Sequence, residues 1–322
     1  MAEEPVFIAG DWGTSRLRLY LCSASPGSRE PLERLDGPGV SLLGDVPGTF
    51  FNLASQWTRK YGSASIILSG MAGSSVGWRE TDYLDCPVEA SAIAKFLHRF
   101  PARGHGVAIV PGLACTNPLG APDVMRGEET EIMGALQIRN DLNFGRHLLC
   151  LPGTHTKWVL LDSARIESFL TGFTGELYSV LGTKSLLAPT SLRHSPSVDQ
   201  AFQLGVDRAL KSGAGDLVGL LFEVRSRRLR GQLAAEDAAN FLSGLIVGRD
   251  VDSALKAFQP SMGRLPETTL IGSHDLTARY AAVLSRLGLK ARLFDCDEPA
   301  LAGLRIFFSM GMKHGGIHSA TA

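Results

Sequence analysis

The chain has 322 residues, which is enough for about two domains with a large apolar core. Its 32 basic and 32 acidic side chains balance, which excludes the strong positive charge typical of nucleic-acid and membrane-surface binding. A solvated helix end explains the basic cluster at residues 225–230. The five cysteines are scattered, and the first apolar run is too short for a signal peptide or a membrane span. We therefore expect a cytoplasmic protein that has neither nucleic acid nor membrane as a partner.

The first motif is a polar turn between two strands, predicted over residues 7–20. The turn combines the carboxylate of Asp11 with Gly13 and the hydroxyls of Thr14 and Ser15. Glycine allows close approach of the backbone, amides and hydroxyls donate to phosphate oxygens, and a carboxylate can hold Mg²⁺ through water. The motif therefore predicts a phosphate site, although an ordinary polar hairpin has the same pattern.

The next elements are expected to be a helix over 50–61, a strand over 64–68, a helix over 90–100 and a strand over 106–110. The loop after residue 68 contains a G-x-S-x-G match centred on Ser75. A hydrolase nucleophile in that motif requires a helix directly after the serine, but residues 78–83 have no apolar helical period. We therefore reject a hydrolase.

A loop carrying Arg126 then leads into a helix whose first turn is acidic, with Glu128, Glu129 and Glu131. Acidic side chains complement the positive end of a helix dipole, which explains their position without any function. That explanation does not account for the Arg126-Gly127 step before the helix. We therefore keep this segment as a candidate site.

Residues 148–161 repeat the first hairpin, with a buried strand, a Gly-Thr turn carrying hydroxyls and a base, and a second strand. Gly153-Thr154 corresponds to Gly13-Thr14. Each hairpin opens roughly half of the chain, which suggests a duplicated architecture with a nucleotide between the halves. Chance recurrence of so short a pattern is the alternative.

The rest of the chain predicts helices up to residue 245, a strand and glycine turn at 269–273, and a helix that ends at Gly288. A strand over 292–294, a helix over 300–312 and a frayed tail from His314 complete it. Helices that alternate with strands favour an α/β fold.

Together these motifs resemble the actin-like ATPase superfamily, in which two phosphate hairpins hold a nucleotide and a glycine turn packs against its adenosine. More closely, the chain resembles the 2-dehydro-3-deoxygalactonokinase family. The resemblance implies two duplicated actin-like (ribonuclease H-like) α/β domains, residues 1–143 and 144–299, with residues 300–322 packing back on the first and a nucleotide cleft between them. The motifs that carry it are residues 11–15, 77–80, 126–130, 151–158, 174–177, 242–245 and 271–273.

The resemblance implies ATP-dependent phosphorylation of 2-dehydro-3-deoxy-D-galactonate at its terminal hydroxyl, which gives the 6-phosphate in galactonate catabolism. It implies ATP and Mg²⁺ as cofactors and the small sugar acid as partner, with a homodimer left open. Two alternatives remain. One is a kinase for a related acid such as 2-dehydro-3-deoxygluconate, and the other is a nucleotide switch or sugar-binding protein of the same fold without turnover.

The resemblance also assigns roles to residues. Glu128, at the start of the interdomain helix, is the base that accepts the substrate proton, with Glu129 as the alternative. Asp11 serves catalysis by holding Mg²⁺ alone, because the second hairpin lacks an aspartate at its start. The other candidates are Gly13, Thr14, Ser15, Arg16, Gly153, Thr154, His155, Thr156 and Lys157 for the phosphates, Gly272 and Ser273 for the adenosine, and Trp78, Arg79 and Arg126 for the substrate.

Several of these residues also have an ordinary structural explanation. Arg16 and Lys157 suit the solvent face of a strand, and Arg79 could form a surface salt bridge with Glu80. His155 is a hydrogen-bonding turn residue rather than a metal ligand, because no His or Cys lies at ligand spacing.

Overall fold

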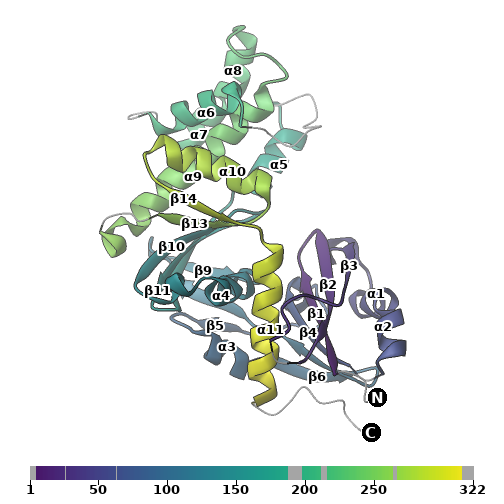
Figure 1. The fold of residues 1–322 in the computed structure, drawn as a ribbon. Coiled ribbons are helices and arrows are strands. Elements are labelled where there is room, and N and C mark those ends of the chain that lie inside the picture. The colour runs from purple at the N-terminus through teal and green to yellow at the C-terminus, as the bar shows by residue number, and fades with distance from the viewer. Residues whose placement is uncertain are drawn as a thin grey trace.

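The computed structural model describes residues 5–25, 27–62, 64–187, 198–211, 216–263 and 267–313. The predicted tail from His314 lies outside these residues. Figure 1 shows two parts that are each centred on a sheet, and a group of helices above the second sheet. Among the described residues, no helix combines the length and the apolar character needed to cross a membrane.

The first sheet is built around the first hairpin, with its strands in the order β3 (Glu33–Pro38), β2 (Arg16–Ser23), β1 (Val6–Trp12), β4 (Ser65–Gly70), β7 (His105–Ile109) and β6 (His98–Ala102). Strands β3, β2 and β1 pair antiparallel. Strands β1, β4 and β7 pair parallel, and β6 closes the edge antiparallel to β7. Parallel pairing brings the carboxyl ends of β1 and β4 to one edge of the sheet.

The second sheet is built in the same way around the second hairpin, in the order β12 (Arg165–Gly172), β11 (Thr156–Asp162), β10 (Arg146–Leu151), β13 (Thr268–Ile271) and β14 (Ala291–Phe294). Strands β12, β11 and β10 pair antiparallel, whereas β10, β13 and β14 pair parallel. Five strands of each sheet therefore share one order and one set of directions. The predicted duplicated α/β fold is confirmed.

The helices are α1 (Val46–Leu53), α2 (Ser55–Lys60), α3 (Ala90–Lys95), α4 (Glu128–Ile138), α5 (Gly175–Lys184), α6 (Gln200–Leu210), α7 (Leu217–Leu221), α8 (Glu223–Leu229), α9 (Ala238–Met262), α10 (His274–Arg286) and α11 (Asp297–Lys313). Short 3₁₀ turns form at η1 (Val40–Leu42), η2 (Met71–Gly73) and η3 (Asn140–Asn143). As predicted, no helix directly follows Ser75.

The prediction of one helix over 90–100 is wrong beyond Lys95. The chain turns into β6 instead, because residues 98–102 pair antiparallel with β7 across a tight turn at Arg103-Gly104. Pro101 is tolerated there because β6 is an edge strand. The edge strand β3 and the small sheet of β5 (Tyr83–Asp85), β8 (Gly112–Thr116) and β9 (Pro122–Met125) were not predicted either.

Helix α11 returns from the second sheet to the first part of the molecule and packs against α4 (Figure 1). The two helices touch at glycines, since a Cβ at Gly134 would collide with the Pro299 carbonyl and one at Gly303 with the Thr130 carbonyl. On the sheet side, Phe308 stacks on Phe7 with ring centroids 3.8 Å apart. The close backbone contact fixes where α4 begins relative to the second half of the chain.

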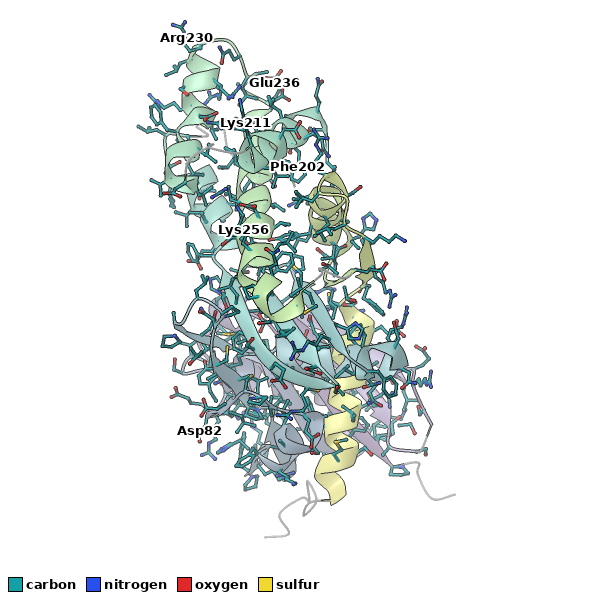
Figure 2. The ribbon with its side chains drawn as sticks, turned by 90° about the vertical axis from the view of Figure 1, so that its left-hand side faces the viewer. Asp82, Phe202, Lys211, Arg230, Glu236 and Lys256 are labelled. Atoms are coloured by element: carbon teal, nitrogen blue, oxygen red, sulfur yellow. The ribbon has the colours of Figure 1, made fainter. Side chains whose placement is uncertain are left out.

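A group of helices, α5 to α9, stands on the second sheet. Figure 2 shows it as the upper end of the molecule, with Arg230 near the tip and Asp82 at the opposite end. Helices α6 and α9 also cross at glycines, because a Cβ at Gly244 would collide with the Phe202 carbonyl. In the basic cluster, Arg227 pairs with Glu223 at 3.1 Å, as expected for a helix surface.

Candidate active site

The first turn is held by hydrogen bonds on one side, and its hydroxyl side chains are exposed on the other. The segment after β3 supports it, because the Val40 and Ser41 amides donate to the carbonyls of Gly13 and Thr14, both at 3.1 Å. The side chains of Thr14 and Ser15 are exposed. Arg16 is not directed to the turn, since it pairs with Asp36 at 2.9 Å on the sheet surface. The backbone and hydroxyls of Gly13, Thr14 and Ser15 are thus the parts of this turn that a ligand can reach.

The second turn is held by the start of α5. Gly175 lies so close to Gly153 that a Cβ would collide with the Gly153 carbonyl, and the Glu176 amide donates to the Thr154 carbonyl at 3.0 Å. The imidazole of His155 lies 2.6 Å from the Glu176 carboxylate and stacks on Phe173. His155 therefore has the contacts of a positioned turn residue, while Thr154 is exposed.

The glycine turn after β13 lies beside the second hairpin. A Cβ at Gly272 would sit 3.4 Å from the Pro152 carbonyl oxygen, and Ser273 is exposed at the start of α10. Next to this turn, a pocket of about 80 Å³ is lined by Gly153, Thr156, Thr174, Gly175, Tyr178, Ser243, Ile246, Val247, Leu276, Arg279 and Tyr280. Apolar walls with a few polar groups suit one face of a small molecule, and the volume is below the roughly 300–1,000 Å³ of pockets that enclose a whole ligand.

Asp11 is buried and forms an ion pair with Arg18 at 3.0 Å. Arg18 also contacts Asp297 at the start of α11, and Asp297 in turn pairs with Arg34 at 2.7 Å. Burial raises the pKa of Asp11, and the positive charge of Arg18 opposes that rise. A chain of alternating charges thus joins the end of β1 to the point where the chain crosses back from the second half.

Glu128 brings the two halves of the site together. It is the first residue of α4, its Oε2 accepts the Arg126 amide at 3.1 Å, and its Oε1 lies 3.8 Å from Lys157 Nζ. Lys157 belongs to the second hairpin and is buried, so it does not lie on the solvent face of its strand. Gly127 has a φ of 111°, a conformation that favours glycine and directs the chain into α4.

The neighbouring Glu129 differs from Glu128 in its surroundings. It is fully buried, its Oε2 accepts the Gly127 amide at 2.6 Å, and its Oε1 accepts the Thr130 hydroxyl at 3.1 Å. Burial, reinforced by repulsion from Glu128, raises its pKa to about 8. Glu129 is therefore mainly protonated at pH 7 and poorly suited to accept a proton.

The three side chains expected at the substrate have distinct contacts. Trp78 packs against Phe50 and Phe100, with centroid distances of 5.2 and 6.0 Å, which is core packing. Arg79 is exposed, and its guanidinium lies 4.7 Å from the Phe100 ring centroid. The described part of the chain contains no ion pair between Arg79 and Glu80.

Arg126 donates hydrogen bonds from its guanidinium to the loop after η2. Its Nη2 donates to the Thr81 carbonyl at 2.8 Å, its Nη1 donates to the Thr81 hydroxyl, and its guanidinium stacks over Tyr83. These contacts hold the loop that carries Trp78 and Arg79 next to the start of α4. Arg126 and Glu128 are thus adjacent both in the sequence and in the structure.

The sequence assigned no individual role to several residues of the site. Glu131 lies on α4 and interacts with the charges of Asp11 and Arg18; burial first, and repulsion from Asp11 second, raise its pKa well above the usual range. Its position three residues after Glu128 is the signal that places it on a neighbouring helix face. Asp250 and the pocket residues Tyr178, Arg279 and Tyr280 left no local signal, because they come together only in the folded chain.

A family model described as 2-keto-3-deoxy-galactonokinase matches residues 11–307, which include the turns of both hairpins, the start of α4 and the glycine turn. The chain belongs to this family. It is 34% identical over 302 residues to a Rhizobium meliloti (strain 1021) protein named as a probable 2-dehydro-3-deoxygalactonokinase, covering 92% of this chain and 95% of that protein. It is also 34% identical over 303 residues to the Escherichia coli (strain K12) 2-dehydro-3-deoxygalactonokinase, covering 92% and 93%.

A crystal structure from Sinorhizobium meliloti that carries the same enzyme name superposes with a TM-score of 0.81 at 32% identity, covering 94% of this chain and 97% of that one. The family resemblance predicted from the motifs, and with it a kinase, is confirmed. The roles of individual residues stay predictions, and they are developed below.

Proposed function

We propose that the protein phosphorylates 2-dehydro-3-deoxy-D-galactonate at its terminal hydroxyl, with ATP as the phosphate donor, and so serves galactonate catabolism. The observation that carries the proposal is the approach of Glu128 to Lys157 at 3.8 Å, within a family match that includes the turns of both hairpins. The relatives from Rhizobium meliloti and Escherichia coli carry this substrate in their names.

In the proposed reaction, Glu128 accepts the proton of the terminal hydroxyl as its oxygen attacks the γ-phosphorus of ATP. The new oxygen–phosphorus bond forms while the bond from the γ-phosphorus to the bridging oxygen breaks, and ADP leaves with that electron pair. Lys157 neutralises charge on the transferred group. The exposed turns at 13–15 and 153–154 hold the phosphates, and Gly272-Ser273 and the pocket beside them receive the nucleoside.

Mg²⁺ fits the end of β1. Asp11 offers hard carboxylate oxygens beside the first turn, and a cation that keeps most of its waters needs only one or two such groups from the protein. When bound, Mg²⁺ would supply positive charge to the phosphates. Another cluster of possible metal ligands among the described residues is Asp295, Cys296 and Asp297. It is less suitable because two arginines, Arg18 and Arg34, pair with Asp297, whereas the described ion pairs give Asp11 one such partner, Arg18.

For the substrate carboxylate we propose Arg79, with Arg126 as the residue that fixes its loop. The exposed N–H groups of Arg79 can form a bidentate pair, whereas two of the Arg126 nitrogens already donate to Thr81. R79K keeps the charge but loses the planar fork. We expect it to raise KM for the sugar acid by about tenfold, with an unchanged KM for ATP. A rise in the KM for ATP alone would contradict this assignment.

The function is tested with an ADP-release assay in which 2-dehydro-3-deoxygalactonate, its gluconate epimer, galactonate and buffer are compared at equal concentration. We expect the galactonate derivative to give the highest kcat/KM, and mass spectrometry should place the phosphate on the terminal oxygen. ATP hydrolysis that no sugar acid stimulates would refute the kinase. A preference for the gluconate epimer would move the substrate to the related acid.

We also propose domain limits at 1–143 and 144–299 with the last helix on the first domain, a cytoplasmic location, and a homodimer. Light scattering after size-exclusion chromatography tests the last point. A monomer mass of 34.5 kDa would contradict it.

A further inference from the structure

A buried hydrogen-bonded chain connects the second hairpin to the two helices of the pocket. Tyr280 Oη donates to Asp250 Oδ2 at 2.9 Å and lies 2.9 Å from the Thr156 hydroxyl, which lies 2.6 Å from the Thr174 hydroxyl. Trp158 Nε1 donates to the same Asp250 oxygen at 2.9 Å. Strand β11 and helices α9 and α10 thus meet at one carboxylate, and the chain of bonds continues through Thr156 to Thr174, directly before α5.

The carboxylate fixes the direction of every bond in this chain. Tyr280 has one hydroxyl proton and gives it to Asp250, so Thr156 must donate to Tyr280. By the same argument Thr174 must donate to Thr156. The Thr156 hydroxyl is therefore turned inward and gives its proton to Tyr280, so we infer that Thr156 serves the phosphates by positioning the turn rather than by donating to them. Its side chain anchors the exposed turn at 153–155 from behind.

Three residues of this hydrogen-bonded chain, Thr156, Thr174 and Tyr280, also line the pocket, and Asp250 lies about one helical turn beyond the lining residue Val247 on α9. Ser243, Ile246, Val247 and Asp250 follow the spacing of one face of α9, and Leu276 and Tyr280 follow that of one face of α10. The Asp250–Tyr280 bond ties these two faces together. The rings of Trp158 and Tyr280 add a contact between β11 and α10, with centroids 6.1 Å apart.

We propose that Asp250 is a positioning residue for nucleotide binding, which acts through Tyr280 and Thr156 to hold the second phosphate turn in register with the nucleoside pocket. The proposal rests on the proposed kinase function for the identity of the nucleotide. It goes beyond that function because it makes one carboxylate, outside both phosphate turns, responsible for the position of the second turn relative to the pocket. A merely structural role would stabilise the second half of the chain without affecting nucleotide affinity.

The chain offers a matched pair of variants. Y280F keeps the ring against Trp158 and removes the hydroxyl that links Asp250 to Thr156. W158F removes the other donor to the same oxygen, which comes from within β11, and leaves the Asp250–Tyr280–Thr156 link beneath the turn intact. Each variant removes one buried hydrogen bond to Asp250 and is expected to destabilise the fold to a similar extent. Only Y280F breaks the connection between the pocket and the turn.

The test is the Kd for ADP by isothermal titration calorimetry with Mg²⁺, together with the KM values for ATP and the sugar acid. We expect Y280F to weaken ADP binding by about tenfold and W158F by less than about twofold, with the KM for the sugar acid unchanged in both. Equal effects of the two variants, or none, would overturn the proposal. T156V breaks the same link at the hairpin, and we expect it to weaken ADP binding as Y280F does. If Y280F does not fold, the Kd of T156V for ADP tests the proposal instead.

The ADP measurement also separates this proposal from the proposed function. If no sugar acid stimulates ATP turnover, the kinase assignment fails, but the Kd for ADP still reports on the position of the second turn relative to the pocket. If turnover is normal and Y280F binds ADP as the wild type does, the positioning role fails and the kinase stands.

Discussion

Replacing Glu128 by Gln removes the carboxylate that we propose as the base while keeping the side-chain shape. The amide oxygen can still accept the Arg126 amide, so the start of α4 should remain in place. The ion pair with Lys157 is long, at 3.8 Å, and the Glu128 side chain is 26% exposed. Because Lys157 is buried, the loss of this partner should cost about 1–3 kcal/mol of unfolding free energy.

The catalytic effect should be larger. A positioned general base contributes about 10²- to 10⁴-fold to the rate, which corresponds to about 3–5 kcal/mol of transition-state stabilisation. We therefore expect E128Q to lower kcat by that factor in the ADP-release assay, with a Kd for ADP within about threefold of the wild type. This separation between kcat and nucleotide affinity distinguishes a base from a residue that only shapes the site.

E129Q is the matched control. Because burial raises the pKa of Glu129 to about 8, its carboxyl is mainly neutral at pH 7, and glutamine is a neutral replacement of similar shape. We expect kcat within a few-fold of the wild type. A large loss in E129Q with normal turnover in E128Q would refute our assignment in favour of Glu129. Normal turnover in both would place the base elsewhere.

Three further predictions concern the framework of the site. G175A places a methyl group against the Gly153 carbonyl, so the second turn must shift. We expect the KM for ATP to rise by at least about tenfold while the KM for the sugar acid is unchanged. Unchanged ATP kinetics would contradict this prediction. G303A should lower the unfolding free energy by about 1–3 kcal/mol in urea titration because the methyl group collides with Thr130 of α4, whereas G44A, which meets nothing within 4 Å, should change it little. The pKa of Glu129 is about 8 in the folded state and 4.5 ordinarily, so between these two pH values the folded state binds more protons than the unfolded state. The free energy of unfolding should therefore fall as pH rises, by up to about 1.4 kcal/mol per pH unit. E129Q should lose this slope, and an identical slope in both proteins would show that the Glu129 carboxyl is not the cause.

The two hairpins and the start of α4 could be predicted from the sequence because their chemistry is local. Gly13 with Thr14 and Ser15 makes a turn with exposed donors wherever two strands flank it, and Gly153 with Thr154 repeats it. The acids after Gly127 likewise mark a helix start within a few residues. The helix predicted beyond Lys95 failed because pairing with β7 outweighed local preference, and pairing with a distant strand leaves no local signal.

Tertiary structure decided which of these groups meet. The close contact of α4 and α11 at Gly134 and Gly303 determines where Glu128 lies, and only then does Lys157 come within 3.8 Å of it. The inward turn of Thr156 likewise depends on Tyr280, which is 124 positions away in the chain. Burial then separates Glu129 from Glu128, since two adjacent glutamates look alike in a sequence and differ only in their access to water.

The sequence by itself therefore determined the turns, the duplicated pattern and the family, because short-range residue chemistry specifies each turn and the order of elements. The folded chain decided which glutamate is buried, which hydroxyl is turned inward and which arginine is held by its neighbours. Those properties arise from desolvation and from contacts between residues far apart in the chain, so no stretch of sequence contains them.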